Sequence, residues 1–149
     1  MKKLLLPVAI VAAVFLYQRW EATPSRTEFQ ETGAAVSTAE ADAIAEAFEG
    51  QQSGVEVSGT GTVSRILGDD VEGDRHQRFI LALDSGHTLL IAHNIDVAPR
   101  IDSLAVGDEV AFHGVYEWND RGGVVHWTHH DPQGQHEAGW IRHRGQAYQ

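Results

Sequence analysis

The sequence predicts a small, mainly β domain with one helix in front of it, and two observations lead to that prediction. From Val55 onwards, apolar and polar residues alternate with a period of two, and glycine, asparagine and aspartate interrupt the pattern at regular intervals. Before that point, one apolar stripe at helical spacing covers only a few turns. Residues 54–149 are enough for one domain with its own core.

The first twenty residues are typical of a segment that directs a chain to a membrane. Two lysines precede an apolar run at residues 4–17, which matches the apolar region of a signal peptide in length. No small-residue cleavage site follows, and Arg19 with Trp20 favours anchoring at the membrane interface. We therefore expect residues 1–20 to be a membrane anchor or a cleaved signal segment. Either one places the domain in the periplasm, attached to the inner membrane if the anchor is retained.

A linker and a helix are expected between this segment and the β domain. Residues 21–36 are rich in Thr, Ser, Glu, Gly and Ala, which is typical of a flexible linker. Ser37 and Glu40 form a capping box, so a helix is predicted over residues 37–50. Its apolar stripe is too narrow for the helix to be stable alone, and it should pack on the barrel. The stripe consists of Ala43, Ile44, Ala47 and Phe48.

Five strands are predicted within residues 54–149. The first is long and contains Gly59 and Gly61, which permit a bend. The strands are expected at residues 55–67, 79–83, 88–92, 109–118 and 124–129. This pattern is typical of an OB-like barrel, although the irregular residues 94–104 replace the helix that usually precedes the fourth strand. The N-terminal helix is expected to cap the barrel instead.

The geometry of the first hairpin predicts which of its residues share a face. A two-residue turn at Ser85 and Gly86 would place Arg78 opposite His93 and Ile80 opposite Ile91. Both faces of this hairpin are apolar, so both must be covered. We expect the apolar stripe of the helix to cover part of the outer face.

Polar residues at the end of this hairpin form a candidate ligand-binding rim. The two arginines in this set could clamp a phosphate or a carboxylate. Alternatively, Asp96 and Arg100 only hold the irregular segment in place. The rim consists of Arg78, His93, Asn94, Asp96 and Arg100.

The last hairpin predicts a second candidate site. A turn at residues 120–123 would place Glu117 opposite His126 and His113 opposite His130, with β-carbons roughly 5 Å apart. Imidazole and carboxylate groups can bind a divalent metal or transfer protons, so these four residues are candidate metal ligands. An acid/base site or a solvated polar face are the alternatives. Residues of the tail could complete a metal site, namely Asp131, His136 and His143. The opposite face is expected to be core, with Val110, Phe112, Tyr116, Trp118, Val125 and Trp127.

Composition narrows the possible functions. Residues 54–149 contain 14 Asp and Glu, 7 Arg and no Lys, a formal charge of −7, which argues against non-specific binding of nucleic acid. The chain has no cysteine and so has neither disulfides nor thiolate metal ligands. The preferred interpretation is an exported accessory binding domain, tethered to the membrane, whose partner is a small ligand or a protein.

Two other functions remain open. In a metal-assisted hydrolase of phosphodiesters, carboxylates of the acidic loop at residues 69–74 would hold the ion. Arg78 or Arg100 would stabilise developing charge, and His76 or His126 would be the base. The third interpretation is a protein that handles haem or a transition metal through its histidine-rich C-terminal third.

Several long motifs resemble an uncharacterised bacterial family of short exported proteins, classified as a domain of unknown function. They are HQRF at residues 76–79, IAHNIDVAPRI at 91–101, YEWN at 116–119 and GGVVHWTHHDP at 122–132. This resemblance extends over nearly all of residues 54–148 and implies no activity. In architecture alone, the chain is similar to the haem chaperone of cytochrome c maturation, which holds haem through a histidine and a tyrosine in a flexible tail. The nearest equivalents here are His143 and Tyr148, with one residue too many between them.

Overall fold

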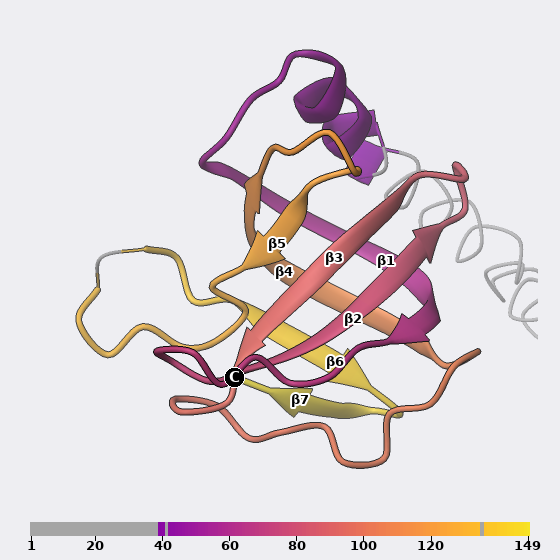
Figure 1. Ribbon diagram of the computed structural model, residues 1–149. Helices are drawn as coiled ribbons and strands as arrows, with labels where there is room; N and C mark the ends of the chain where they lie inside the picture. Colours follow the sequence, from indigo (N-terminus) through magenta and orange to yellow (C-terminus); the bar gives the residue numbers. More distant parts are fainter. Residues whose placement is uncertain (1–38, 41, 135) are drawn as a thin grey trace, which may run out of the picture. The chain divides into compact units, whose positions relative to one another are not determined.

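Seven strands form the β domain in the computed structural model, which describes residues 39–40, 42–134 and 136–149 (Figure 1). They are β1 (Val55–Ile66), β2 (His76–Leu83), β3 (Thr88–Asn94), β4 (Glu109–Glu117), β5 (Val124–His126), β6 (Trp140–His143) and β7 (Gln146–Tyr148). The predicted anchor at residues 1–20 and the linker at 21–36 lie outside the described residues. No helix in the described part of the chain is long and apolar enough to span a bilayer.

Five of the strands close into a barrel in the order β1-β2-β3-β5-β4, because β4 also pairs with β1. All neighbours are antiparallel except β3 and β5, which pair in parallel. This is the OB arrangement, so the predicted OB-like barrel is confirmed. The long strand β1 reaches both of its neighbours because it bends. Its register with β2 shifts between Val63 and Arg65, while Gly59 leaves room for the Phe112 ring, since a β-carbon there would lie 2.8 Å from that ring.

The C-terminal tail, in which no strand was predicted, forms the hairpin of β6 and β7. β6 pairs with residues 110–113 of β4, on the same edge of β4 as β5 but beyond the end of that short strand. Alternate residues point inward, so that Ile141, His143 and Tyr148 are buried. The similarity to a haem-binding flexible tail therefore fails at both of its residues, because each lies in a strand and is buried.

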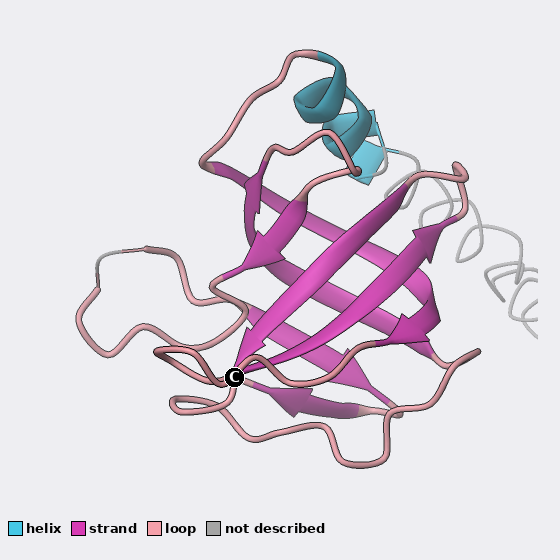
Figure 2. Ribbon diagram, in the orientation of Figure 1, coloured by secondary structure: helices cyan, strands magenta, loops and turns pink. Residues whose placement is uncertain are grey.

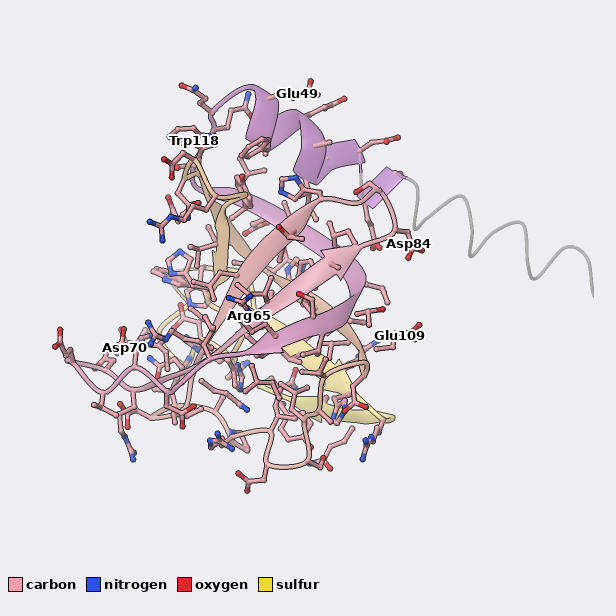
Figure 3. The ribbon with its side chains drawn as sticks, turned by 45° about the vertical axis from the view of Figure 1, so that its right-hand side comes forward. Glu49, Arg65, Asp70, Asp84, Glu109 and Trp118 are labelled. Carbon is pink, nitrogen blue, oxygen red and sulfur yellow. The ribbon has the colours of Figure 1, made fainter. Side chains whose placement is uncertain are left out.

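The helix, observed at residues 42–49, caps one end of the barrel as predicted (Figure 2). Ile44 is fully buried in the core, and the Phe48 ring lies 4.9 Å from the His87 ring in the β2–β3 turn. The Trp118 indole Nε1 donates a hydrogen bond of 3.1 Å to the Phe48 carbonyl, beside the end of the helix at Glu49 (Figure 3). The expectation that the helix covers the outer face of the β2–β3 hairpin is wrong, because Ile44 and Ala47 pack into the same core as the inward-facing Phe112, while Ala43 of the predicted stripe is exposed.

The predicted register of the β2–β3 hairpin is wrong by one residue. The loop has three residues, 84–86, and the Leu83 amide donates to the His87 carbonyl at 2.8 Å. Gly86 takes a φ of 84°, the left-handed conformation that this type of loop needs. Arg78 consequently lies opposite Ala92 and faces outward, whereas His93 lies opposite Gln77 and faces inward.

The irregular connection from β3 to β4 closes the other end of the barrel. Ala98, Ile101 and Leu104 are buried there. Gln77 holds this connection with both ends of its amide: its Nε2 donates to the Ile101 carbonyl at 3.0 Å, and its Oε1 accepts from the Ile101 amide at 2.9 Å. A buried glutamine that pairs with both backbone groups of one residue leaves none of them unsatisfied.

Candidate functional site

The arginines of the predicted rim are already paired with carboxylates. Arg100 donates to Asp69 at 3.0 Å and to Asp102 at 3.0 Å. Arg78 donates to the Gly68 carbonyl at 3.1 Å and lies 3.6 Å from the Asp70 carboxylate. Both interactions tie the connection between β1 and β2 to its surroundings. An anionic ligand would have to displace these carboxylates before it reached either guanidinium.

Asp96 pairs with Arg75, a residue that the sequence did not single out. The backbone amide and the Nε of Arg75 each donate to the Asp96 carboxylate at 2.7 Å. These hydrogen bonds lower the pKa of Asp96 below its usual value. The Asn94 side chain accepts from the Asp96 amide at 2.9 Å and shapes the same turn. These contacts agree with the alternative interpretation of the rim, in which Asp96 and Arg100 only hold the irregular residues 94–104 in place.

His93 is not part of an exposed rim, because its side chain is fully buried. Its Nε2 lies 3.1 Å from the Pro99 carbonyl, which can only accept, so Nε2 carries the hydrogen. The Thr128 hydroxyl then donates to Nδ1 at 2.8 Å. Burial lowers the pKa of His93 to about 4. His93 is therefore neutral at pH 7 and joins β3 to the segments on either side of it.

The last hairpin has a register two residues away from the predicted one. Val115 lies opposite His126 and Glu117 lies opposite Val124. The connection is two residues longer than predicted, residues 118–123, and the Asn119 side chain holds it by accepting from the amides of Arg121 and Gly123 at 2.8 and 3.1 Å. A shift of two residues preserves the faces. The predicted core is accordingly confirmed at four positions, Val110, Phe112, Tyr116 and Val125, while Trp118 is partly buried against it.

Trp127 departs from the prediction, because β5 ends at His126 and the chain turns there. Trp127 has a φ of 54°, which a large residue rarely adopts, and its side chain is 36% exposed. The turn sends Thr128 into the interior and carries His129 and His130 away from β4 in a long loop (Figure 1). The predicted pairing of His130 with His113 is therefore wrong.

His113 has other neighbours. It lies opposite Trp140 of β6, and its Nδ1 is hydrogen-bonded to the Ser58 hydroxyl at 2.9 Å. Its Nε2 lies 3.8 Å from the Glu137 carboxylate. Of the four predicted metal ligands, the structure brings together only Glu117 and His126, whose Oε1 and Nε2 atoms are 3.5 Å apart. Burial lowers the pKa of His126, and nearby Glu117 opposes that effect.

The loop that follows β5 adds residues to this pair. The Trp127 ring lies 5.6 Å from the His126 ring on one side and 4.0 Å from the His136 ring on the other. The His129 ring lies 5.5 Å from that of His136. We call this group the histidine–tryptophan cluster. It consists of His126, Trp127, His129 and His136 with the carboxylates of Glu117 and Asp131.

Two of the three tail residues that could complete a site, Asp131 and His136, lie in this cluster. The third, His143, is buried elsewhere and its Nε2 lies 2.8 Å from Asp108. In residues 39–40, 42–134 and 136–149, no three His, Asp or Glu side chains lie where they could hold a metal ion together.

The candidate catalytic residues of a hydrolase do not form one arrangement of nucleophile, base and metal ligands. Asp69 and Asp70, from the loop predicted to hold the ion, are paired with Arg100 and Arg78. The His76 Nδ1 donates to the Asp74 carbonyl at 2.8 Å. The fourth candidate, His126, belongs to the histidine–tryptophan cluster on β5.

The fold and this cluster define a class: an OB-like barrel domain with histidine side chains gathered where its shortest strand ends. The chain belongs to the family described as Protein of unknown function (DUF3465), whose model matches residues 29–149. The resemblance of the sequence motifs to a family of unknown function is thereby confirmed. No curated protein matches the chain. Any role for the cluster must therefore be inferred from its chemistry.

Proposed function

We propose that the protein is an exported accessory binding domain, tethered to the membrane, that takes up a divalent transition-metal ion at the histidine–tryptophan cluster. One observation carries this proposal: three imidazoles and two carboxylates gather around an exposed tryptophan in a strained backbone conformation. Backbone strain of this kind is concentrated at functional sites. Imidazole with carboxylate is a ligand combination suited to zinc, copper and nickel ions.

The electrostatics of the domain favour a cation over an anion as the ligand. The domain carries a formal charge of −7, and the arginines at positions 75, 78 and 100 already have carboxylate partners. The lowered pKa of His126 favours the neutral imidazole, which has an electron pair for a metal. The same carboxylate pairs weigh against a hydrolase whose acidic loop holds an ion.

The export part of the proposal rests on the N-terminal sequence. We expect a C-terminal epitope on the full chain to be degraded when protease is added to spheroplasts, because the positively charged N-terminus remains in the cytoplasm. A matched chain without residues 1–20 should be protected in the same experiment. Protection of the full chain would contradict export.

The metal part of the proposal predicts a bound ion. The full chain, purified in detergent without chelator and loaded with one equivalent of Zn²⁺, should retain about one ion per chain after desalting, as expected for a single site. Mass spectrometry for metals gives the content. A triple variant with alanine at His126, His129 and His136 should retain none, whereas His87→Ala, at the other end of the barrel, should behave like the wild type. Absence of zinc from the wild type would contradict the proposal.

A further inference from the structure

We propose that a small zwitterion, a free amino acid or a dipeptide, binds on the outer face of the sheet where β4 and β6 pair, with its carboxylate on Arg142 and its ammonium group on Glu109. This site is separate from the histidine–tryptophan cluster, and the inference does not depend on metal binding. Three observations carry it: a hollow of suitable size, an arginine without a carboxylate partner, and a glutamate on the opposite side of the hollow.

The hollow lies on the outward face of β4 and β6. It has a volume of about 340 Å³, which is within the range of pockets that hold small molecules. Ala111 lies at its base, directly opposite Arg142 in the register of the two strands. Because the alanine side chain ends at its β-carbon, the longer side chains around it leave a depression. The residues that line the hollow are Asp108, Glu109, Ala111, Arg142, Arg144 and Gly145.

Arg142 borders this hollow without a carboxylate partner. Among the described residues, the arginines at positions 75, 78, 100 and 144 each form an ion pair with an aspartate, whereas Arg142 forms none. Its guanidinium carbon instead lies 4.2 Å from the centre of the Trp140 ring, a cation–π contact that holds the group in place. A guanidinium that is held but not paired can donate two parallel hydrogen bonds to the carboxylate of a ligand.

The second arginine of the hollow is already neutralised. Arg144 Nη2 donates to the two oxygens of Asp108 at 3.1 and 3.3 Å. The same carboxylate accepts from His143 Nε2 at 2.8 Å and from the Ala105 amide at 2.9 Å. The hydrogen bond from His143, followed by those from the Ala105 amide and Arg144, lowers the pKa of Asp108. Asp108 and Arg144 therefore form a fixed wall, which leaves the other two charges of the hollow for a ligand.

Glu109 supplies the negative charge of the site (Figure 3). Its side chain is exposed, forms no ion pair within the part of the chain that the structure describes, and is a diagonal neighbour of Arg142 in the β4–β6 ladder. Diagonal neighbours are roughly 7–8 Å apart, so long side chains at these positions can meet. Here they do not, because Arg142 lies over Trp140, which is on the side of Arg142 away from Glu109. The two opposite charges consequently remain apart, with the hollow between them.

A ligand that carries both charges fits this arrangement better than an anion or a cation alone. In an amino acid the ammonium nitrogen and the carboxylate carbon are two bonds, or about 2.5 Å, apart, and a dipeptide adds about 3.5 Å. A charge-assisted hydrogen bond of about 2.7–2.9 Å at each end supplies the rest of the distance. Because such a ligand has no net charge, it also escapes the repulsion that an anion would meet from a domain with a formal charge of −7.

The test is a nuclear magnetic resonance titration of the nitrogen-15-labelled full chain in detergent at pH 7.5. The probes are glycine, diglycine, acetate and methylammonium, each added separately. Glycine or diglycine should shift the amide signals of Ala111, Arg142 and Gly145, and the tighter of the two gives the length of the ligand. Acetate and methylammonium, each with a single charge, should bind at least about tenfold more weakly, since each can pair with only one side of the hollow.

Substitutions of the two charged residues separate recognition from a merely structural role. Glu109→Gln and Arg142→Gln should each weaken glycine binding by about tenfold or more, because one charge of the ligand loses its partner. Glu56→Gln and Arg121→Gln are the matched controls, since both residues are exposed and neither lines the hollow. Glycine binding should be lost in Glu109→Arg and in Arg142→Glu, and recovered when the two are combined, because the ligand can then bind in the reverse orientation.

Thermal unfolding of each variant checks that the charge changes leave the fold intact. Equal affinity for acetate and glycine, with normal glycine binding in Glu109→Gln, would show a simple anion site and overturn the inference. Equal affinity for methylammonium and glycine, with normal binding in Arg142→Gln, would overturn it in favour of a cation site. The absence of any shift at the hollow of the folded wild type with glycine and diglycine would overturn it altogether. None of these outcomes bears on the proposed metal binding.

Discussion

Replacing Gly123 with alanine is expected to lower the free energy of unfolding by about 4 kcal/mol. Gly123 has a φ of 97°, and a β-carbon there would collide with the ring of Tyr116. Backbone strain costs about 1–3 kcal/mol and overpacking of a core about as much again. Tyr116 cannot move aside easily, because it is fully buried and its hydroxyl donates to the Gly122 carbonyl at 3.1 Å.

Urea denaturation of the wild type and of Gly123→Ala measures this loss directly. Gly86→Ala is the matched control, since Gly86 also has a positive φ but has no atom within 4 Å of the β-carbon position. It should lose only about 1–2 kcal/mol, the cost of the conformation alone. Equal losses at the two positions would show that the contact with Tyr116 contributes nothing.

Acidification from pH 7 to pH 4 is expected to cost the domain about 3 kcal/mol through His93 alone. Burial lowers the pKa of His93 in the folded protein from 6.5 to about 4. Above pH 6.5 both states are neutral at this residue and the stability is complete. Between pH 6.5 and pH 4 the unfolded chain takes up a proton that the folded protein does not, so stability falls, at about 1.4 kcal/mol for each unit of pKa difference.

The contribution of His93 is isolated by comparison with His93→Gln, which cannot titrate. Unfolding free energies of both proteins at pH 7 and pH 4 should show a larger loss for the wild type, by about 3 kcal/mol. Asp96 and Asp108 have lowered pKa values and also lose stability in acid, but they do so equally in both proteins. An equal loss in wild type and variant would show that His93 is not held neutral by its burial.

The faces of the strands could be predicted because side chains alternate with a period of two. Phe112, Tyr116 and Val125 were assigned to the core on that basis and are fully buried. The registers could not be predicted, because they depend on how many residues each loop uses. In the first hairpin, a loop one residue longer than expected placed Arg78 and His93 on opposite faces, although they were predicted to face each other. In the last hairpin, the error of two residues left the faces unchanged.

The strands β6 and β7 could not be predicted from the sequence because they have only four and three residues, respectively. A period of two can scarcely be detected over that length, and the polar residues before β6 favoured a loop. These two strands form because the edge of β4 is left unpaired where β5 ends, and β6 pairs with that edge. The double hydrogen bond from Gln77 to Ile101 also had no signal in the sequence, since the two residues are 24 positions apart.

The sequence by itself determined that this protein has an OB-like barrel with a capping helix and belongs to a family of unknown function. Those properties follow from local periodicity and from motifs, both of which are written along the chain. Only the tertiary structure decided that the rim arginines are paired, that His93 is buried, and that His136 and Asp131 lie beside Trp127. The physical reason is that such contacts depend on loop conformation, above all on the turn at Trp127, which no local pattern of residues specifies.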